Sequence, residues 1–375
     1  MKVNYDFYTG KDNYCDGDVE KDIIQYLDEY GEENYQEIFK KDIRWPVFYH
    51  ITPIRKNILK WYPFKDGAEI LEIGAGMGAI TGILCDNAKH VTSVELSKQR
   101  ASAIEKRCKD KDNLELIVGN FNNIKFNKKF DYITLIGVLE YAPLYTNTEN
   151  PFNDFLLQIK SLLKEDGKLL IAIENQYGMK YFSGAPEDHT GKIYDGIAGY
   201  NNKKGIRTFG KNELKGILEK SGFKYTKFYY PMPDYKLPNI IFSDEYKPDE
   251  KNIQNYTPYL SEEKSSVEYD EKEAYIDIIK NGMFEFFANS FFIEAGVHKI
   301  DTKIDLSKQE LIKIDESMKN FYDKHYKIGK LQENTSLEKQ LIEENNKLKE
   351  ELNAMVNSKS WKITKPFRDF RSKNK

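Results

Sequence analysis

Three glycines and a pair of acids form the part of this sequence best suited to chemistry. The segment EILEIGAGMGAITGIL, residues 69–84, places Gly74, Gly76 and Gly78 between an expected β-strand and an expected helix. Glycine lets a chain turn sharply and bring its backbone to a ligand, and a helix N-terminus directs free N–H groups at that ligand. The pattern predicts a nucleotide-binding loop. With Ala79 it also fits the dinucleotide fingerprint, so alone it leaves the nucleotide open.

Two acidic residues narrow the choice of nucleotide. Glu95 ends the next β-rich run, VTSVEL, nineteen positions beyond Gly76. A carboxylate there can accept hydrogen bonds from both hydroxyls of an adenosine ribose. Glu72 stands two positions before Gly74, where it would repel a pyrophosphate but suits the charged amino acid end of S-adenosylmethionine.

A third β-rich run ends in VGNF, residues 118–121. The side chain of Asn120 can bind the amino group of an adenine, and Phe121 can cover its ring. A plain turn asparagine is the alternative.

The elements that must position these residues alternate along the chain. From Ala68 the β-rich runs AEILEI, HVTSVEL, LELIVG, FDYITLIGV and KLLIAIE are separated by helical stretches, and KYTKFYY and ANSFFIEAG follow later. This rhythm predicts an α/β fold, a Rossmann-like parallel sheet with helices on both faces. Residues 231–282 begin with too many prolines for a central strand, so they are predicted to form a cap insertion, as are residues 176–208.

In this order the motifs resemble those of the class I S-adenosylmethionine-dependent methyltransferases. The resemblance spans about residues 68–297 and rests on EIGAGMG, VEL, VGNF, FDYITLIGVLEY, and the succession of DGKLLIAIEN and EKSGF. It implies a seven-stranded sheet whose last strand is antiparallel, with S-adenosylmethionine as the cofactor. Asn120 departs from the aspartate of many members. The positions implied to bind the cofactor are Glu72, Gly74, Ala75, Gly76, Gly78, Glu95, Leu96, Asn120, Phe121, Gly137, Val138 and Leu139.

Candidate catalytic residues follow the fifth strand, where this architecture holds the transferred group. A methyl group on a sulfonium is already activated, so the protein must chiefly align the reactants, and a hydroxyl acceptor also needs a base. Glu174, Glu187, Asp188 and His189 are the candidates, with His189 as the preferred base because neutral imidazole accepts a proton near pH 7. An ordinary polar loop is one alternative. A divalent cation held by the acids and His189 is another, but their spacing is not diagnostic, and no metal site is predicted.

The remaining segments flank the predicted cofactor domain, residues 67–300. Residues 1–66 are predicted to form an N-terminal helical flap, in which His50 and Arg55 could close on the cofactor carboxylate. Heptad spacing in residues 305–356 predicts a coiled coil for dimerisation or docking, with one amphipathic helix folded on its own domain as the alternative. The basic and aromatic tail, residues 357–375, suits an anionic membrane surface.

Composition limits the partners, the cysteine chemistry and the cellular location that we expect for the protein. The 57 Lys and Arg nearly balance the 60 Asp and Glu, so overall charge does not favour a nucleic acid partner. Three cysteines without CxxC spacing disfavour a disulfide framework and a zinc site. With neither a signal peptide nor a span-length apolar segment, we predict a cytoplasmic protein whose tail can reach the inner face of the membrane.

A narrower likeness bears on the acceptor. YHITPIRKNIL, ENQYGMKYFSGAPEDHTG and YYPMPDYKLPNIIFSDE resemble a bacterial methyltransferase subgroup found beside surface-polysaccharide glycosyltransferases, and SKSWKITKPFR resembles a segment near those enzymes. The likeness implies O-methylation of a sugar in a cell-surface glycan or its lipid-linked precursor, with glycosyltransferases as partners. Two other functions stay open: an NAD(P)-dependent oxidoreductase, which Ala79 and Glu95 also fit, and a non-catalytic scaffold for glycosyltransferases.

Overall fold

The computed structural model describes residues 1–12, 17–201, 204–255, 269–305, 310–325, 344 and 346–351. The chain divides into two units, residues 1–328 and residues 329–375. In the second unit, residues 346–351 are helical. Most of the predicted second half of the coiled coil and the whole basic tail lie outside the described residues. The sections below concern the first unit.

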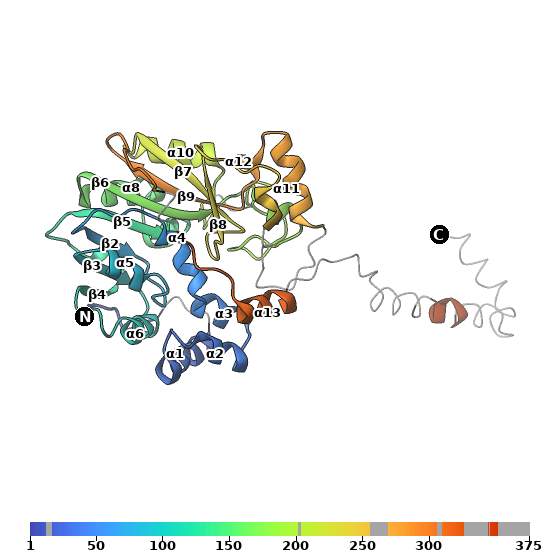
Figure 1. Ribbon diagram of the computed structural model, residues 1–375, viewed down its shortest axis with the longest axis horizontal. Coiled ribbons are helices and arrows are strands. Elements are labelled where there is room, and N and C mark those ends of the chain that lie inside the picture. Colours follow the sequence, from blue (N-terminus) through green and yellow to red (C-terminus); the bar gives the residue numbers. More distant parts are fainter. Residues whose placement is uncertain are drawn as a thin grey trace, which may run out of the picture. The chain divides into compact units, whose positions relative to one another are not determined.

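A nine-stranded mixed sheet forms the centre of the first unit (Figure 1). The strands are β1 (Lys2–Phe7), β2 (Glu69–Ile73), β3 (His90–Glu95), β4 (Leu114–Gly119), β5 (Phe130–Ile136), β6 (Leu163–Glu174), β7 (Tyr225–Met232), β8 (Ile240–Ser243) and β9 (Ser290–Gly296). Their order is β1-β4-β3-β2-β5-β6-β9-β7-β8. Neighbours from β1 to β6 pair in parallel, whereas β9 is antiparallel to β6 and β7, and β8 is antiparallel to β7.

The predicted number of strands, seven, is wrong by two. Both additional strands lie at the edges of the sheet: β1 forms from the first residues of the predicted flap, residues 1–66, which is therefore not helical throughout, and β8 lies in the predicted cap. The run KVNYDF of β1 alternates polar and apolar residues, as suits an edge strand with one covered face, and β8 follows two prolines that an edge strand tolerates. Without them, the remaining strands have β9 as their antiparallel member, as predicted.

Helices cover both faces of the sheet, which confirms the predicted layers. In β6, Leu169, Ile171 and Ile173 face one layer while Leu170 and Ala172 face the other, because successive side chains of a strand alternate. The first layer contains α8 (Pro151–Leu162), α10 (Lys211–Lys220), α11 (Glu271–Lys280) and α12 (Phe284–Phe287). The second contains α4 (Asn57–Lys60), α5 (Thr81–Asn87) and α6 (Lys98–Arg107). The remaining short helices are η1 (Pro53–Lys56), η2 (Phe121–Asn123), η3 (Leu139–Tyr141), α7 (Ala142–Tyr145), α9 (Met179–Phe182) and η4 (Asn252–Asn255).

A third hydrophobic cluster joins the N-terminal flap to the end of this unit. It contains α1 (Val19–Tyr30), α2 (Tyr35–Lys41), α3 (Trp45–Ile51) and α13 (Glu316–His325), which lies beside α3 in Figure 1. Phe321 of α13 stacks on Phe48 of α3, with ring centroids 3.7 Å apart, and Met318 is fully buried. These heptad residues are therefore covered by their own unit. Of the described residues in the first half of the predicted coiled coil, Glu316–His325 form a helix folded on its own domain, whereas residues 310–315, with Leu311 and Ile314, are not helical.

The side chain of Asn57 connects three segments of the chain by hydrogen bonds. Asn57 of α4 donates from Nδ2 to the carbonyl oxygens of Pro238 and Ile312, both at 2.9 Å, and accepts from the N–H of Ile312 at 2.7 Å. The flap, the cap and the segment before α13 thus share one buried amide. Among the described residues, no helix combines the length and apolar character needed to cross a bilayer.

Candidate active site

A cavity of about 390 Å³ lies at the carboxyl ends of β2 to β6. The last residues of these five strands line it: Ile73, Glu95, Gly119, Ile136 and Glu174. The order of strands reverses between β2 and β5, and ligands of open α/β sheets bind in the crevice at such a switch point. The flap adds Trp45, Tyr49, His50 and Arg55 to the wall, and the cap adds Pro186 to His189, Tyr235 and Lys236.

The glycine loop after β2 is shaped by positive φ angles and close packing. Gly74, Gly76 and Gly78 have φ of 73°, 57° and 79°, which favour glycine. A Cβ at Gly74 would lie 2.6 Å from Val138, whereas a Cβ at Gly76 would meet no atom within 4 Å. Gly74 and Gly76 line the cavity, so the loop presents its backbone there. Gly78 does not line it and instead faces Ile104 of α6.

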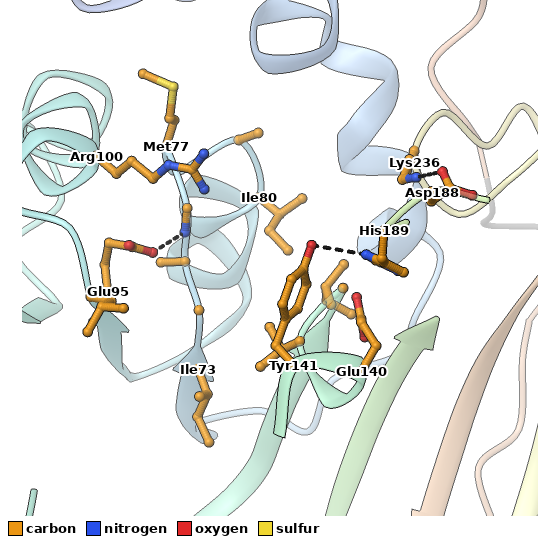
Figure 2. Close-up of a pocket in the computed structure, with 18 of the residues that line it drawn as sticks. Ile73, Met77, Ile80, Glu95, Arg100, Glu140, Tyr141, Asp188, His189 and Lys236 are labelled. Carbon is orange, nitrogen blue, oxygen red and sulfur yellow. Dashed lines mark hydrogen bonds and ion pairs between the residues drawn. The ribbon is translucent and has the colours of Figure 1, made fainter. Parts of the chain in front are cut away.

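Glu95 lies at one side of the cavity and braces the glycine loop (Figure 2). Its Oε2 accepts from the N–H of Gly76 at 2.7 Å, and its Oε1 accepts from the N–H of Ser97 at 2.9 Å. Burial raises the pKa of this carboxyl, which is only 4% exposed. Each carboxylate oxygen keeps a second lone pair. Glu95 can therefore accept two further hydrogen bonds from a ligand.

The other predicted cofactor residues divide into two groups. Ala75, Leu96, Asn120, Phe121, Gly137 and Val138 line the cavity. Asn120 caps η2 by accepting from the N–H of Asn122 at 2.9 Å, and Phe121 meets Phe155 edge to face at 5.7 Å. Glu72 and Leu139 do not line the cavity.

Glu72 lies behind the glycine loop. Its Oε2 accepts from Thr81 Oγ1 at 2.8 Å and Ser93 Oγ at 2.6 Å, which joins β2 to α5 and β3. Burial raises the pKa of Glu72 to about 7. This acid supports the loop from below, so its predicted place beside the amino acid end of a cofactor is not where its side chain lies.

At the other side of the cavity, Glu140, Glu174 and His189 come together as an acid–histidine cluster (Figure 2). His189 Nε2 lies 3.6 Å from Glu174 Oε2, just beyond hydrogen-bond length, and its Nδ1 lies 3.2 Å from the hydroxyl of Tyr141. The sequence prediction named Glu174 and His189 but missed Glu140. Glu140 directly follows Leu139 in GVLEY, so its place after the β5 strand was the available signal.

Ion pairs surround the acid–histidine cluster. Lys236 lies 2.8 Å from Glu174 Oε1 and also pairs with Asp188. Lys180, which is fully buried, lies 2.8 Å from both Asp188 and Asp234. These two lysines hold the pKa of Asp188 far below its usual range, against the effect of burial. Asp188 therefore serves as an ion-pair partner in this arrangement.

Most residues that line this cavity lie in a part of the chain that matches a known protein family. Residues 47–227 match the model of a family described as a methyltransferase domain. This match identifies a methyltransferase domain within the chain. S-adenosylmethionine is the cofactor of such domains.

Several relatives and solved structures share parts of the methyltransferase domain. Ribosomal RNA small subunit methyltransferase A of Fusobacterium nucleatum is 28% identical over 112 residues, which are 30% of this chain and 41% of that protein. An uncharacterised methyltransferase of Staphylococcus carnosus is 36% identical over 103 residues, 27% of this chain and 45% of that protein. The chain thus spans less than half of either relative. A solved S-adenosylmethionine-dependent methyltransferase of Thermotoga maritima covers 74% of this chain and aligns over its whole length at 14% identity, with a TM-score of 0.40.

The charge state of His189 bears on its predicted role in the methyltransferase domain. Burial alone would lower its pKa, but Glu174 and Glu140 outweigh burial and raise the pKa to about 9. A general base must be neutral to accept a proton, so this state does not favour the role, which stays a prediction. Glu187 accepts from the N–H groups of His189 and Thr190 at 2.8 and 2.7 Å. It holds the turn that presents His189.

Proposed function

We propose that this chain transfers a methyl group from S-adenosylmethionine to a hydroxyl of a sugar, in a cell-surface glycan or its lipid-linked precursor. The observation that carries the proposal is one cavity that contains both Glu95 and the acid–histidine cluster. The first is suited to a ribose, and the second to an acceptor whose proton must leave. The sugar itself rests on the sequence likeness to the polysaccharide-associated subgroup.

The residues at the Glu95 side fit the nucleoside part of the cofactor. Glu95 has lone pairs for the two ribose hydroxyls, and Gly76 leaves open space beside its backbone. Asn120 and Phe121 offer an amide and a ring for adenine. When bound, S-adenosylmethionine supplies a methyl group on a positively charged sulfur. The excess of carboxylates at the opposite side would favour that charge.

The residues at the opposite side fit a hydroxyl-bearing acceptor. Tyr141, Tyr235 and Lys236 line the cavity beside the acid–histidine cluster, so donors and acceptors alternate on this wall. Such a wall can orient several hydroxyls of one sugar by hydrogen bonds. The proton of the reacting hydroxyl would pass to the acid–histidine cluster, since this is where unpartnered acceptor atoms lie.

Labelled cofactor and mass spectrometry test this function. Purified chain should transfer label from S-adenosylmethionine to lipid-linked saccharides, and glycans from cells that lack the protein should each be lighter by one methylene group. Glu95→Ala should reduce the transfer at low cofactor concentration, in proportion to its weaker cofactor binding. Ribosomal RNA serves as the competing acceptor, because it is the substrate named for several relatives. Label in RNA and none in saccharide would overturn the sugar proposal.

A binding measurement and a transfer measurement separate the alternatives. An oxidoreductase would bind NAD, whereas a methyltransferase should bind S-adenosylhomocysteine and give no heat with NAD. A non-catalytic scaffold would transfer no label to any acceptor, even at saturating cofactor.

A further inference from the structure

We propose that Glu140, Glu174 and His189 hold a divalent metal ion at the acceptor side of the cavity. One carboxylate oxygen from each glutamate and one ring nitrogen of the histidine lie within 4.8 Å of one another. All three residues line the cavity. The acid–histidine cluster thus offers two oxygen ligands and one nitrogen ligand in one place.

Neighbouring elements of the fold bring these ligands together. Glu174 is the last residue of β6, and Glu140 lies in η3, just beyond the end of the paired strand β5. His189 reaches them from the cap, where Glu187 fixes its backbone. Metal binding through Nε2 requires the proton on Nδ1, and Tyr141 lies 3.2 Å from Nδ1 to accept it. Nε2 therefore faces Glu174, and a metal ion bound there would displace its proton.

Unpartnered buried atoms point to a missing ligand. Among the described residues, both Oε atoms of Glu140 are buried without a hydrogen-bond partner, and Oε2 of Glu174 and Nε2 of His189 are buried with no partner except each other, 3.6 Å apart. Glu140 is 1% exposed and Glu174 is fully buried. Each such group costs about 1–3 kcal/mol, so native proteins seldom leave several of them together. A water molecule could donate only two protons to these atoms, whereas a cation accepts electron pairs from all of them.

The surrounding charges leave room for a cation. The acids around the cluster, Glu140, Glu174, Glu187, Asp188 and Asp234, outnumber the cations that face them among the described residues, which are Lys180, Lys236 and His189. The lysines lie on Asp188, Asp234 and Oε1 of Glu174, so Oε2 of Glu174 and the whole of Glu140 are not paired by them. A divalent ion beside these oxygens would balance most of the remaining charge.

The donor set selects among metals. Carboxylate oxygens with one imidazole suit Mn²⁺, Fe²⁺ or Zn²⁺ better than Mg²⁺, which prefers oxygen alone. Ligand bonds of about 2.0–2.2 Å place adjacent ligand atoms roughly 2.8–3.6 Å apart, so atoms that now lie within 4.8 Å of one another would move closer by up to about 2 Å to complete the site. Three protein ligands leave coordination positions open for an acceptor.

The use of this metal rests on the proposed function. An acceptor hydroxyl bound at an open position would have a lowered pKa, because the ion stabilises the alkoxide. Its proton would pass to the oxygen of Glu140 that does not bind the metal. The acceptor oxygen would then form a bond to the methyl carbon as the carbon–sulfur bond breaks, and the electron pair of that bond stays on the sulfur as a neutral thioether.

Manganese binding tests the site without any turnover. Titration of the full-length wild-type protein with Mn²⁺ alone, followed by electron paramagnetic resonance, should show loss of the free-ion signal at one ion per chain. Glu140→Gln and His189→Gln should each weaken Mn²⁺ binding at least about tenfold, as loss of a ligand requires. Both should still bind S-adenosylhomocysteine, which shows that the variants are folded.

Glu95→Gln is the matched control, because it removes a buried carboxylate from the other side of the same cavity. It should weaken S-adenosylhomocysteine and leave Mn²⁺ binding unchanged. Equal Mn²⁺ affinity in wild type and the two ligand variants, or an undiminished free-ion signal with wild type, would overturn the metal site. Methyl transfer by metal-free protein would overturn the role of the metal and keep the proposed function. Mn²⁺ binding without transfer to any acceptor would keep the metal site and overturn the proposed function.

Discussion

Replacement of Glu95 by alanine should weaken S-adenosylhomocysteine binding by about 1–3 kcal/mol, which raises Kd roughly 5- to 150-fold. Glu95 is buried, lines the cavity and keeps one free lone pair on each oxygen. Taken alone, two charge-assisted hydrogen bonds to ribose hydroxyls would stabilise the complex by more than about 1–3 kcal/mol. Water that enters the cavity in the variant would offset part of the loss, so we expect the lower range.

A second effect of the substitution must be separated from the first. Glu95 also accepts from the N–H of Gly76, so alanine could weaken binding by loosening the glycine loop. A ligand without ribose hydroxyls distinguishes the two effects. Wild-type protein should bind the 2′,3′-dideoxy analogue of S-adenosylhomocysteine more weakly than the parent, whereas Glu95→Ala should bind both alike. This is a double-mutant cycle in which one partner is the ligand.

Isothermal titration calorimetry of the four pairs gives the coupling energy directly. Glu72→Gln is the control, because Glu72 does not line the cavity and its variant should keep the wild-type preference for the ribose hydroxyls. If Glu95→Ala discriminated between the two ligands as strongly as wild type, the assignment of Glu95 to the ribose would be wrong.

Three predictions concern stability. The pKa of Glu72 lies at about 7 in the fold against an ordinary 4.5, so the stability contributed by its protonated form is complete below pH 4.5 and lost as pH rises past 7. Glu72→Gln should therefore gain up to about 3 kcal/mol over wild type in urea unfolding at pH 8 and little at pH 4.5; an equal difference at both values would contradict this. Lys180→Met leaves Asp188 and Asp234 buried without their shared cation and should cost about 3–5 kcal/mol, which thermal unfolding would detect; an unchanged Tm would exclude the ion-pair argument. Phe321→Ala should lower the free energy of unfolding by about 3–5 kcal/mol through the cavity left beside Phe48. It should also weaken the binding of S-adenosylhomocysteine, since α3 lines the site. Normal affinity in calorimetry would show that the packing of α13 on α3 does not support the pocket.

Local patterns were enough to bring most of the predicted cofactor residues to the wall of the cavity. The strand, glycine loop and helix of residues 69–84 are adjacent in sequence, and Glu95 ends the strand that pairs with β2. Period and turn chemistry suffice for such neighbours. The run KVNYDF alternates polar and apolar residues, a strand period that the sequence prediction missed, and its pairing with β4 joins residues too far apart in sequence for a local pattern to show.

The acid–histidine cluster and its ion pairs depend on contacts that residue spacing in the sequence does not reveal. Lys180 meets Asp234 across the cap, and Glu140 meets His189 from another loop. A lysine in a loop gives no sign of full burial until its partners are placed. Heptad spacing around Met318 and Phe321 likewise shows that a helix has one apolar face, but not whether a second chain or its own domain covers that face.

The packing of α13 on α3 sets an order for maturation of the protein. Trp45, Tyr49 and His50 wall the cavity from a helix made early in synthesis, yet Phe321, which covers the back of that helix, is made some 270 residues later. A nascent chain can complete its sheet by Gly296 while this wall still lacks its support. Cofactor capture should therefore wait until α13 has been made, and a fragment that stops where the sheet ends should bind nucleoside more weakly than the whole chain.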